Sequence, residues 1–235
     1  NNAIKRSHHH MTTIEDILPD LTDAKVFSVL DAKNGFWHVE LDDESSKLTC
    51  FNTPYGRYRW LRMPFGLKSA PEEYARRQGQ ALEGLEGVKI IADDLLIFGV
   101  GATQQEAIKD HNNCLLQVMQ RCQQVGLKLN KEKANLGLKQ IPFLGHVISD
   151  SGLLPDPRKI RAVIDMPVPT DVKAVQRLLG FINYLGKFLP KLSDLCEPLR
   201  QLTIKGIIFD WTSYHTAALD KIKAAVTEYP VLRYF

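Results

Sequence analysis

The sequence predicts an α+β fold in which helices cover one face of an antiparallel sheet. Short segments rich in Val, Ile, Leu and Phe, which favour strands, alternate with amphipathic helical segments. Two strand segments follow each other so closely that they predict a hairpin, and two capping-box patterns mark helix starts. The order strand, helix, hairpin, helix, strands is typical of this class.

The first hundred residues contain both strands and helices. The expected elements are a short helix at residues 13–21, strands at 24–30 and 36–41, a helix at 69–84 and a hairpin at 88–98. Ser69 and Glu72 have the spacing of a capping box, which predicts the start of the long helix. The hairpin is unusual because Asp93 and Asp94 separate its two apolar strands.

The rest of the chain changes from mixed to helical. The expected elements are a helix from Thr103 to Gly126, strands at 126–130 and 141–149, a helix from Thr170–Asp171 and a last helix at 213–227. Residues 151–157 (SGLLPDP) predict a boundary. The helix after Asp171 is amphipathic, and its apolar positions are Val172, Val175, Leu178, Leu179, Ile182 and Leu185.

Composition excludes some classes of protein. With 44% hydrophobic and 24% charged residues, the chain is an ordinary globular sequence rather than a disordered one. We expect no membrane span, and we expect the four cysteines to be reduced thiols of an intracellular protein, because they form no CxxC pair. The net charge of +3 permits a polyanionic partner, and residues 156–205 hold nine Lys or Arg against five Asp or Glu. His8–His10 are read as a solvated connector.

Asp93 and Asp94 are the strongest candidates for chemistry. A carboxylate in an apolar hairpin is costly to desolvate unless it is paired or bound to a metal. The chain supplies its own comparison, because the pair Asp42–Asp43 lies in a polar stretch and reads as a solvated turn or helix start. An acidic hairpin tip on the surface remains the alternative interpretation of Asp93–Asp94.

Asp31 ends one predicted strand as Asp93 ends another. If these strands are neighbours, the carboxylates converge and repel one another unless a divalent cation neutralises them. Mg²⁺ suits such oxygen donors, and two ions could clamp the attacking and leaving oxygens of a phosphoryl transfer. Residues 61–77, with their Pro-Phe-Gly turn, lie between the two aspartate motifs, although alone they could be an ordinary entry into a helix.

Five segments in this order resemble the successive motifs of a reverse transcriptase, more narrowly that of gypsy-type LTR retrotransposons. They are LDAKNGFWHVEL, FNTPYGRYRWLRMPFGLKSAP, ADDLLIF, GLKLNKEKANL and IPFLGHVIS. The resemblance implies a right-hand polymerase palm with partial fingers at residues 1–150, a helical thumb at 151–205, and a connector toward ribonuclease H at 206–235. It also implies that the chain is a fragment of a Pol polyprotein.

The resemblance assigns roles around the aspartates. It implies that Asp31, Asp93 and Asp94 are catalytic and hold two Mg²⁺ ions, with Mn²⁺ as an alternative, and that the Ala32 carbonyl helps. Phe36 matches the steric gate that rejects a ribose 2′-hydroxyl. Phe65 and Gly66 match the lining of the dNTP site.

The resemblance also assigns contacts to the leaving group and the nucleic acid. Lys133 matches a lysine suspected of protonating pyrophosphate, although Lys128 and Lys131 are close by and a solvated lysine face is an equal reading. The expected nucleic-acid contacts are the primer grip, Phe143, Leu144, Gly145 and His146, and the thumb-helix residues Gln176, Gly180 and Tyr184. The spacing of four puts the last three on one helical stripe.

The chain differs from the family pattern at Ile91, and parts of the family pattern would lie outside residues 1–235. Ile91 stands where most relatives carry Tyr, so we expect altered fidelity or rate rather than lost chemistry. The basic finger residues that grip the triphosphate would lie upstream, which leaves activity of this chain alone open. The first ribonuclease H carboxylate would lie beyond residue 235, so we expect no ribonuclease H activity.

The implied activity is RNA-directed and DNA-directed DNA polymerisation. Its expected partners are a template–primer duplex, dNTPs and the protease, ribonuclease H and integrase of the full polyprotein, in a cytoplasmic virus-like particle or the nucleus. Two alternatives remain at this stage: a domesticated or decayed copy that only binds nucleic acid, and a ferredoxin-like RNA-binding module. The second would stack bases on sheet aromatics, which residues 88–92 lack.

Overall fold

A computed structural model describes residues 1, 4–6, 8–189, 192–228 and 231–234. The chain divides into two compact units, Asn1–Ile141 and Pro142–Tyr234. The boundaries expected at 150/151 and 205/206 do not coincide with this division. The reason is that strand β7 (Gln140–Phe143) joins the sheet of the second unit.

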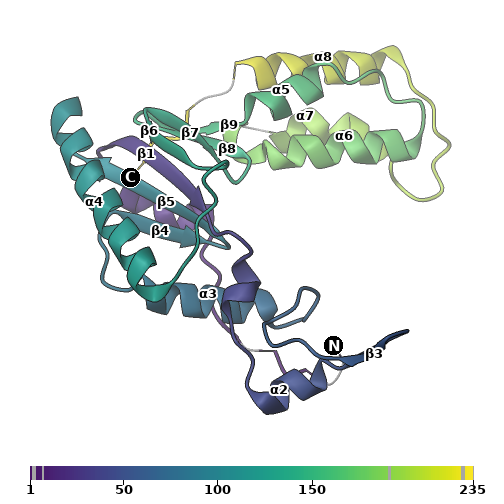
Figure 1. Cartoon of the computed structure of the whole chain (residues 1–235). Helices are drawn as coiled ribbons and strands as arrows, with labels where there is room; N and C mark the ends of the chain where they lie inside the picture. The colour runs from purple at the N-terminus through teal and green to yellow at the C-terminus, as the bar shows by residue number, and fades with distance from the viewer. Residues whose placement is uncertain (2–3, 7, 190–191, 229–230, 235) are drawn as a thin grey trace. The chain divides into compact units, whose positions relative to one another are not determined.

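The first unit contains a four-stranded sheet in the order β4-β5-β1-β6 (Figure 1). Its strands are β1 (Ala24–Asp31), β4 (Val88–Ile91), β5 (Asp94–Val100) and β6 (Asn135–Leu138), with a separate hairpin of β2 (Phe51–Thr53) and β3 (Gly56–Tyr58). Its helices are α1 (Ile14–Ile17), η1 (Leu18–Leu21), η2 (Gly35–His38), α2 (Asp43–Leu48), α3 (Ala70–Ala81) and α4 (Gln104–Val125). The pairings of β1 with β5 and β6, and of β4 with β5, are antiparallel, which confirms the predicted α+β class.

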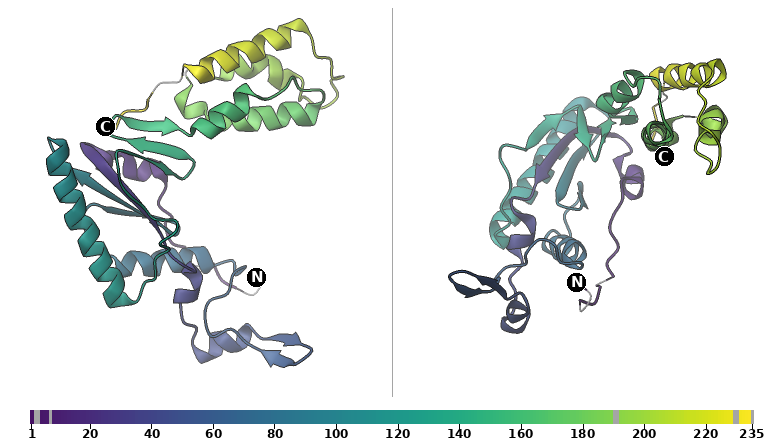
Figure 2. Two further views of the ribbon diagram at one scale, coloured as in Figure 1. Left: turned by 45° about the horizontal axis from the view of Figure 1, so that its top comes forward. Right: turned by 90° about the vertical axis from the view of Figure 1, so that its right-hand side faces the viewer.

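Helix α4 lies along the sheet, as both views in Figure 2 show. Leu30 and Leu95 from the sheet pack with Cys114 and Val118 of α4 in one buried cluster. Gly99 permits the close approach, because a methyl group there would come within 2.2 Å of the carbonyl oxygen of Ala107. Side chains alternate along a strand, so the residues next to Leu30 and Leu95 belong to the opposite face of the sheet.

The predicted ends of α4 are confirmed. Thr103 Oγ1 accepts a hydrogen bond from the Glu106 amide at 3.2 Å, and the Glu106 carboxylate accepts one from the Thr103 amide at 3.0 Å. Gly126 ends the helix in the left-handed conformation at φ +72°. Asp42 caps α2, which confirms the helix-start interpretation of the Asp42–Asp43 pair.

Three local predictions in this unit were wrong. Residues 36–41 do not form a strand: left-handed Asn34 turns the chain, and the Trp37 amide donates to the Asn34 carbonyl in η2. Ser69 makes no side-chain cap, and Glu72 accepts a hydrogen bond from Arg6 Nε at 2.6 Å. Residues 126–130 make one isolated bridge, Ala32 to Leu129, and the strand beside β1 is β6.

The second unit combines a three-stranded sheet, in the order β7-β8-β9, with four α-helices among its described residues. The remaining elements are β8 (His146–Ser149), β9 (Gly152–Pro155), α5 (Pro157–Ile164), α6 (Val172–Tyr184), η3 (Gly186–Phe188), α7 (Leu192–Gln201) and α8 (Ser213–Thr227). The predicted helices at 170–185 and 213–227 are confirmed. Strand β9, inside the expected boundary segment, was not predicted.

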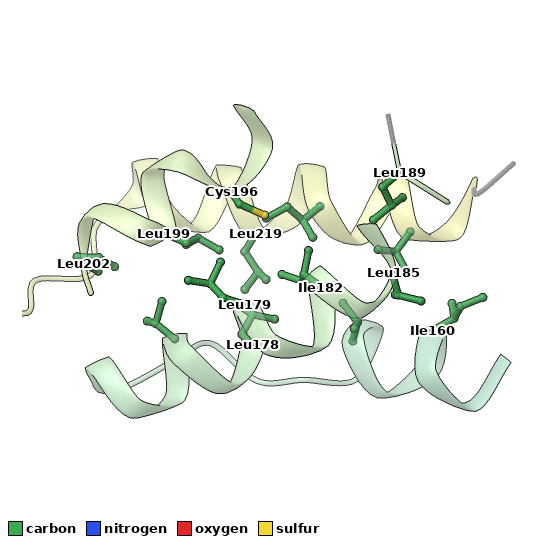
Figure 3. Close-up of a cluster of buried hydrophobic side chains, with 14 residues drawn as sticks. Ile160, Leu178, Leu179, Ile182, Leu185, Leu189, Cys196, Leu199, Leu202 and Leu219 are labelled. Atoms are coloured by element: carbon green, nitrogen blue, oxygen red, sulfur yellow. The ribbon is translucent and has the colours of Figure 1, made fainter. Parts of the chain in front are cut away.

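The helices of the second unit share one apolar core (Figure 3). Leu178 and Ile182 of α6 are fully buried in it, as Leu199 of α7 and Ile222 of α8 are. Helix α8 contributes to this core, so residues 213–227 pack together with the other helices, and the connector role of 206–235 stays a prediction. No described helix combines the length and apolar character that a bilayer crossing requires.

Candidate active site

Asp31 and Asp94 face each other across the two central strands. They are paired residues at the end of the antiparallel ladder between β1 and β5. Their neighbours Leu30 and Leu95 pack toward α4, so both carboxylates belong to the opposite face of the sheet. The structure therefore brings together residues that are far apart in sequence, as the convergence argument predicted.

Asp93 lies in the two-residue turn that joins β4 to β5. The ladder closes at the pair Ile91 and Asp94, and Ala92 adopts the left-handed region at φ +57°. The Ala32 amide donates to the Asp93 carbonyl at 3.2 Å, which fixes the turn to the end of β1. Ile91 is buried, with 6% of its surface exposed. The aspartate pair thus lies at a hairpin tip that a backbone hydrogen bond fixes to the end of β1, with Asp93 exposed and Asp94 half-buried.

Lys133 is the lysine that reaches this site. Its Nζ lies 3.2 Å from each carboxylate oxygen of Asp31. The segment before it is anchored to the same strand end, because the Asn130 amide donates to the Asp31 carbonyl at 2.8 Å. Lys128 instead bonds through its backbone amide to His38. Of the three candidate lysines, Lys133 is the one whose ammonium group contacts Asp31.

The carboxylates interact electrostatically. Burial first, and then the charges of Asp93 and Asp31, together raise the pKa of Asp94 from 3.8 to about 6, against the opposing charge of Lys133. Burial and the same two charges also raise the pKa of the Tyr74 phenol. Excess negative charge in a half-buried place favours binding of a cation.

The donor atoms of the site suit a divalent cation, but the described side chains are not already arranged as a metal site. The available atoms are carboxylate oxygens, the ligands that Mg²⁺ prefers. Within the described residues, no three His, Cys, Asp or Glu side chains are gathered closely enough to hold a metal ion. Lys133 occupies the Asp31 carboxylate, and a cation would offset the repulsion that shifts Asp94.

Phe36 and Phe65 line a cavity beside Asp93. The cavity measures about 130 Å³, and Gly35, Tyr74 and Asp93 also border it. The Phe36 ring lies 5.2 Å from the Phe65 ring and 5.7 Å, edge-on, from the Tyr74 ring. Phe36 thus lines the same cavity as Asp93, from a 3-10 turn and not from the strand that was predicted.

The Pro-Phe-Gly turn presents its aromatic ring to solvent. Phe65 is 64% exposed, and Gly66 has φ +86° with open space where a side chain would be. Trp37 is 42% exposed, whereas Val39 is buried. Ala32 is also buried.

The hairpin of the second unit is held by Tyr184. Leu144 and Gly145 both have positive φ, at +48° and +77°, in the turn between β7 and β8. The Tyr184 hydroxyl donates to the Gly145 carbonyl, and its oxygen lies 3.5 Å from Nε2 of His146. Phe143 and His146 are buried, so the turn is the exposed part of this motif.

The three residues predicted to form one stripe on α6 do not share one environment. Gln176 and Gly180 are exposed, and a methyl group on Gly180 would have no atom of the described residues within 4 Å. Tyr184 instead contacts its own unit. Lys159 adds positive charge here, with its Nζ 5.9 Å from the centroid of the Phe181 ring.

Sequence reasoning missed Tyr74. It packs edge-on against Phe36, yet the only sequence signal was an aromatic residue within the helix that follows the Pro-Phe-Gly turn. The contact of Tyr74 with Phe36 depends on how α3 packs, and the local sequence does not reveal that packing.

Comparisons with known proteins agree with this geometry. The family described as "Reverse transcriptase (RNA-dependent DNA polymerase)" matches residues 1–148. The retrovirus-related Pol polyprotein from transposon 412 of Drosophila melanogaster is 34% identical over 100% of this chain and 19% of its own length. The enzymatic polyprotein of Figwort mosaic virus (strain DxS) is 32% identical over 99% of this chain and 34% of its own length.

A solved structure is similar as well. A foamy viral protease–reverse transcriptase in complex with double-stranded DNA matches with a TM-score of 0.87 and 25% identity, over 99% of this chain and 40% of that one. The present chain thus spans between about a fifth and a third of the two polyproteins described above.

Proposed function

Because this chain belongs to the reverse transcriptase family, we propose that it forms the palm and thumb of an RNA-directed DNA polymerase, which also copies DNA. The observation that carries the proposal is the pairing of Asp31 with Asp94 across the ladder, with Asp93 in the adjoining turn. In this proposal the first unit supplies the palm and the second unit the primer grip and thumb.

The proposed reaction extends a primer by one nucleotide. The primer 3′-hydroxyl attacks the α-phosphate of a dNTP, the bond to the β-phosphate breaks, and pyrophosphate leaves. Asp31, Asp93 and Asp94 would hold two divalent cations, which supply charge neutralisation for the attacking and leaving oxygens. Lys133, beside Asp31, donates a proton to the leaving pyrophosphate.

Selection of the sugar is assigned to Phe36. Its ring is supported on two sides by Phe65 and Tyr74, so it cannot easily move away from a ribose 2′-hydroxyl. Phe65 and Gly66 line the dNTP site in this proposal. The exposed turn of Leu144 and Gly145 holds the primer terminus.

Binding of the template–primer is assigned to the thumb helix. Gln176 and Gly180 present an open surface on α6 that a nucleic-acid backbone can approach. The excess of Lys and Arg in residues 156–205 would make this binding dependent on salt and largely independent of base sequence. We further propose a gypsy-type element as the source, with protease, ribonuclease H and integrase in the full polyprotein.

Primer extension on poly(rA)/oligo(dT) with Mg²⁺ tests the proposal. The assay compares this chain with a version extended upstream through the fingers. Each protein is tested as the wild type and with Asp93→Asn. Asp43→Asn, in the solvated aspartate pair, is the matched control. We expect extension that Asp93→Asn abolishes and Asp43→Asn preserves. A silent extended protein, or one that Asp93→Asn leaves unchanged, would favour a decayed copy that only binds nucleic acid.

A further inference from the structure

Lys159 in helix α5 carries a positive charge that forms no ion pair with any described residue. The nearby acid Asp156 is buried and is already engaged by Arg158, whose Nη2 lies 2.8 Å from its carboxylate and whose amide donates to it at 2.8 Å. The contacts with Arg158, and more weakly the charge of Lys159, hold the pKa of Asp156 below its usual value. Two cations therefore share one carboxylate, and a net positive charge remains.

Two aromatic rings of α6 hold the Lys159 ammonium group. Its Nζ lies 5.9 Å from the centroid of the Phe181 ring and 5.6 Å from that of the Tyr184 ring. A cation within about 6 Å of such a ring is attracted to its electron-rich face. The contacts are possible because α5 and α6 pack against each other (Figure 1). A side chain held in this way loses less conformational entropy when it binds a ligand.

The same two rings adjoin the surfaces to which the nucleic acid is assigned. Phe181 is 36% exposed and follows Gly180, whose open side on α6 is proposed to receive the duplex. The Tyr184 hydroxyl donates to the Gly145 carbonyl, in the turn that is proposed to hold the primer terminus. Lys159 thus places a positive charge beside both surfaces, and all of these residues belong to the second unit.

We propose that Lys159 is a primer-binding residue that contacts one backbone phosphate near the primer 3′ end. The inference rests on the proposed function, because it assigns a further contact to the same template–primer. A lysine ammonium group binds a phosphate as a point charge, which requires neither a particular base nor a bidentate geometry. Since the turn containing Gly145 is assigned to the primer terminus, the strand nearest Lys159 is the primer.

The alternative role of Lys159 is packing alone. In that case its four-carbon stem covers apolar surface of α6 and its charge serves only to reach solvent. Lys159→Met keeps an unbranched side chain but removes the charge. Lys159→Arg keeps the charge and can still stack on the two rings. Comparison of these two variants therefore separates the charge from the packing.

Binding of a primer–template duplex is measured on the full chain in EDTA, by fluorescence anisotropy over a range of salt concentrations. EDTA removes divalent cations, so the result does not depend on catalysis. Lys221→Met, at an exposed position on α8, is the matched control because it removes the same charge from the same unit. Melting temperatures of the free proteins show that each variant is folded.

We expect Lys159→Met to weaken binding roughly 5–10-fold and to reduce the slope of log K against log salt by about 0.9, the value for one phosphate contact. Lys159→Arg should restore both quantities, and Lys221→Met should bind as the wild type does. Phe181→Leu should weaken binding without changing the slope, because the cation remains but one of its supporting rings is lost.

Neutral methylphosphonate linkages, introduced one at a time, identify the strand. In the wild type, one primer linkage near the 3′ end should weaken binding when it is neutralised. At that linkage Lys159→Met should cause no further loss, since the interaction has already been removed. The corresponding template linkages should show no such coupling to Lys159.

Two results would overturn this inference alone. If the wild type binds the duplex and Lys159→Met matches Lys221→Met in affinity and slope, Lys159 has only a packing role. If the coupling falls on a template linkage and on no primer linkage, the assigned strand is wrong. A wild type that binds no duplex would overturn the inference together with the proposed function.

Discussion

Lys133 holds Asp31 by both carboxylate oxygens, each 3.2 Å from the lysine Nζ. The ammonium group therefore neutralises a carboxylate that the proposed reaction needs for a cation. Since Lys133 is 65% exposed, the ion pair itself contributes little to stability. Its significance lies in placing a proton donor at the end of β1.

Lys133→Gln should therefore separate metal binding from catalysis. Loss of the ammonium group frees Asp31 and should tighten Mg²⁺ binding, while loss of the proton donor should lower kcat about 10²-fold or more. Mg²⁺ titration and single-turnover primer extension on the finger-containing protein measure the two effects. Lys131→Gln is the matched control, and an unchanged kcat in Lys133→Gln would remove Lys133 from the mechanism.

Asp94 should make stability depend on pH. Folding raises its pKa from 3.8 to about 6, so the folded state holds the proton more tightly than the unfolded state. Its contribution to stability is complete below about pH 4 and is lost as the pH rises through 6. Asp94→Asn should consequently gain roughly 1 kcal/mol over the wild type at pH 7.5, after allowance for solvent screening, but not at pH 4.

Urea unfolding across this pH range measures the effect. Mg²⁺ should stabilise the wild type more at pH 7.5 than at pH 5, since it replaces the proton. A difference between Asp94→Asn and the wild type that does not vary with pH would contradict the assigned shift.

Phe36→Val should relax the choice of sugar. Removing the ring opens the cavity beside Asp93, and we expect incorporation of ribonucleotides to rise roughly 10–100-fold relative to deoxyribonucleotides. Competing rNTP and dNTP incorporation by the finger-containing protein gives the ratio. Trp37→Val changes the next residue, which is exposed, and should leave the ratio of rNTP to dNTP incorporation unchanged. The same ratio in both variants would contradict the assignment of Phe36 as the gate.

Gly180→Ala should stabilise the protein while weakening template–primer binding. No described residue occupies the space of the new methyl group, so the helix gains about 0.5–1 kcal/mol. Gly79→Ala, likewise open and within α3, should give the same gain without loss of binding. Urea melts and fluorescence anisotropy with a labelled duplex test both parts, and equal affinity in the two variants would refute the contact.

Tyr184→Phe should loosen the turn that contains Gly145. The lost hydrogen bond to the Gly145 carbonyl is expected to cost about 1 kcal/mol and to shorten the products of each binding event. Tyr214→Phe, at an exposed position on α8, is the control. Melting curves and single-cycle primer extension are the measurements; unaltered product length would limit Tyr184 to a structural role.

The sequence by itself determined the features that depend on neighbouring residues. The Thr103–Glu106 capping box and Gly126 set the ends of α4, and the apolar stripe after Asp171 set the buried face of α6. Asp31 and Asp93 could be placed at strand ends because each follows an apolar run. Local hydrogen bonds and side-chain periodicity are sufficient for these predictions.

Only the tertiary structure decided which distant groups meet. Asp31 and Lys133 are 102 residues apart, and local sequence does not distinguish Lys133 from its neighbouring lysines. Tyr74 of α3 packs edge-on against Phe36, and Tyr184 of α6 donates to the Gly145 carbonyl in the β7–β8 turn. The physical reason is that long-range contacts depend on how whole elements pack, whereas caps and periodicity are properties of a few consecutive residues.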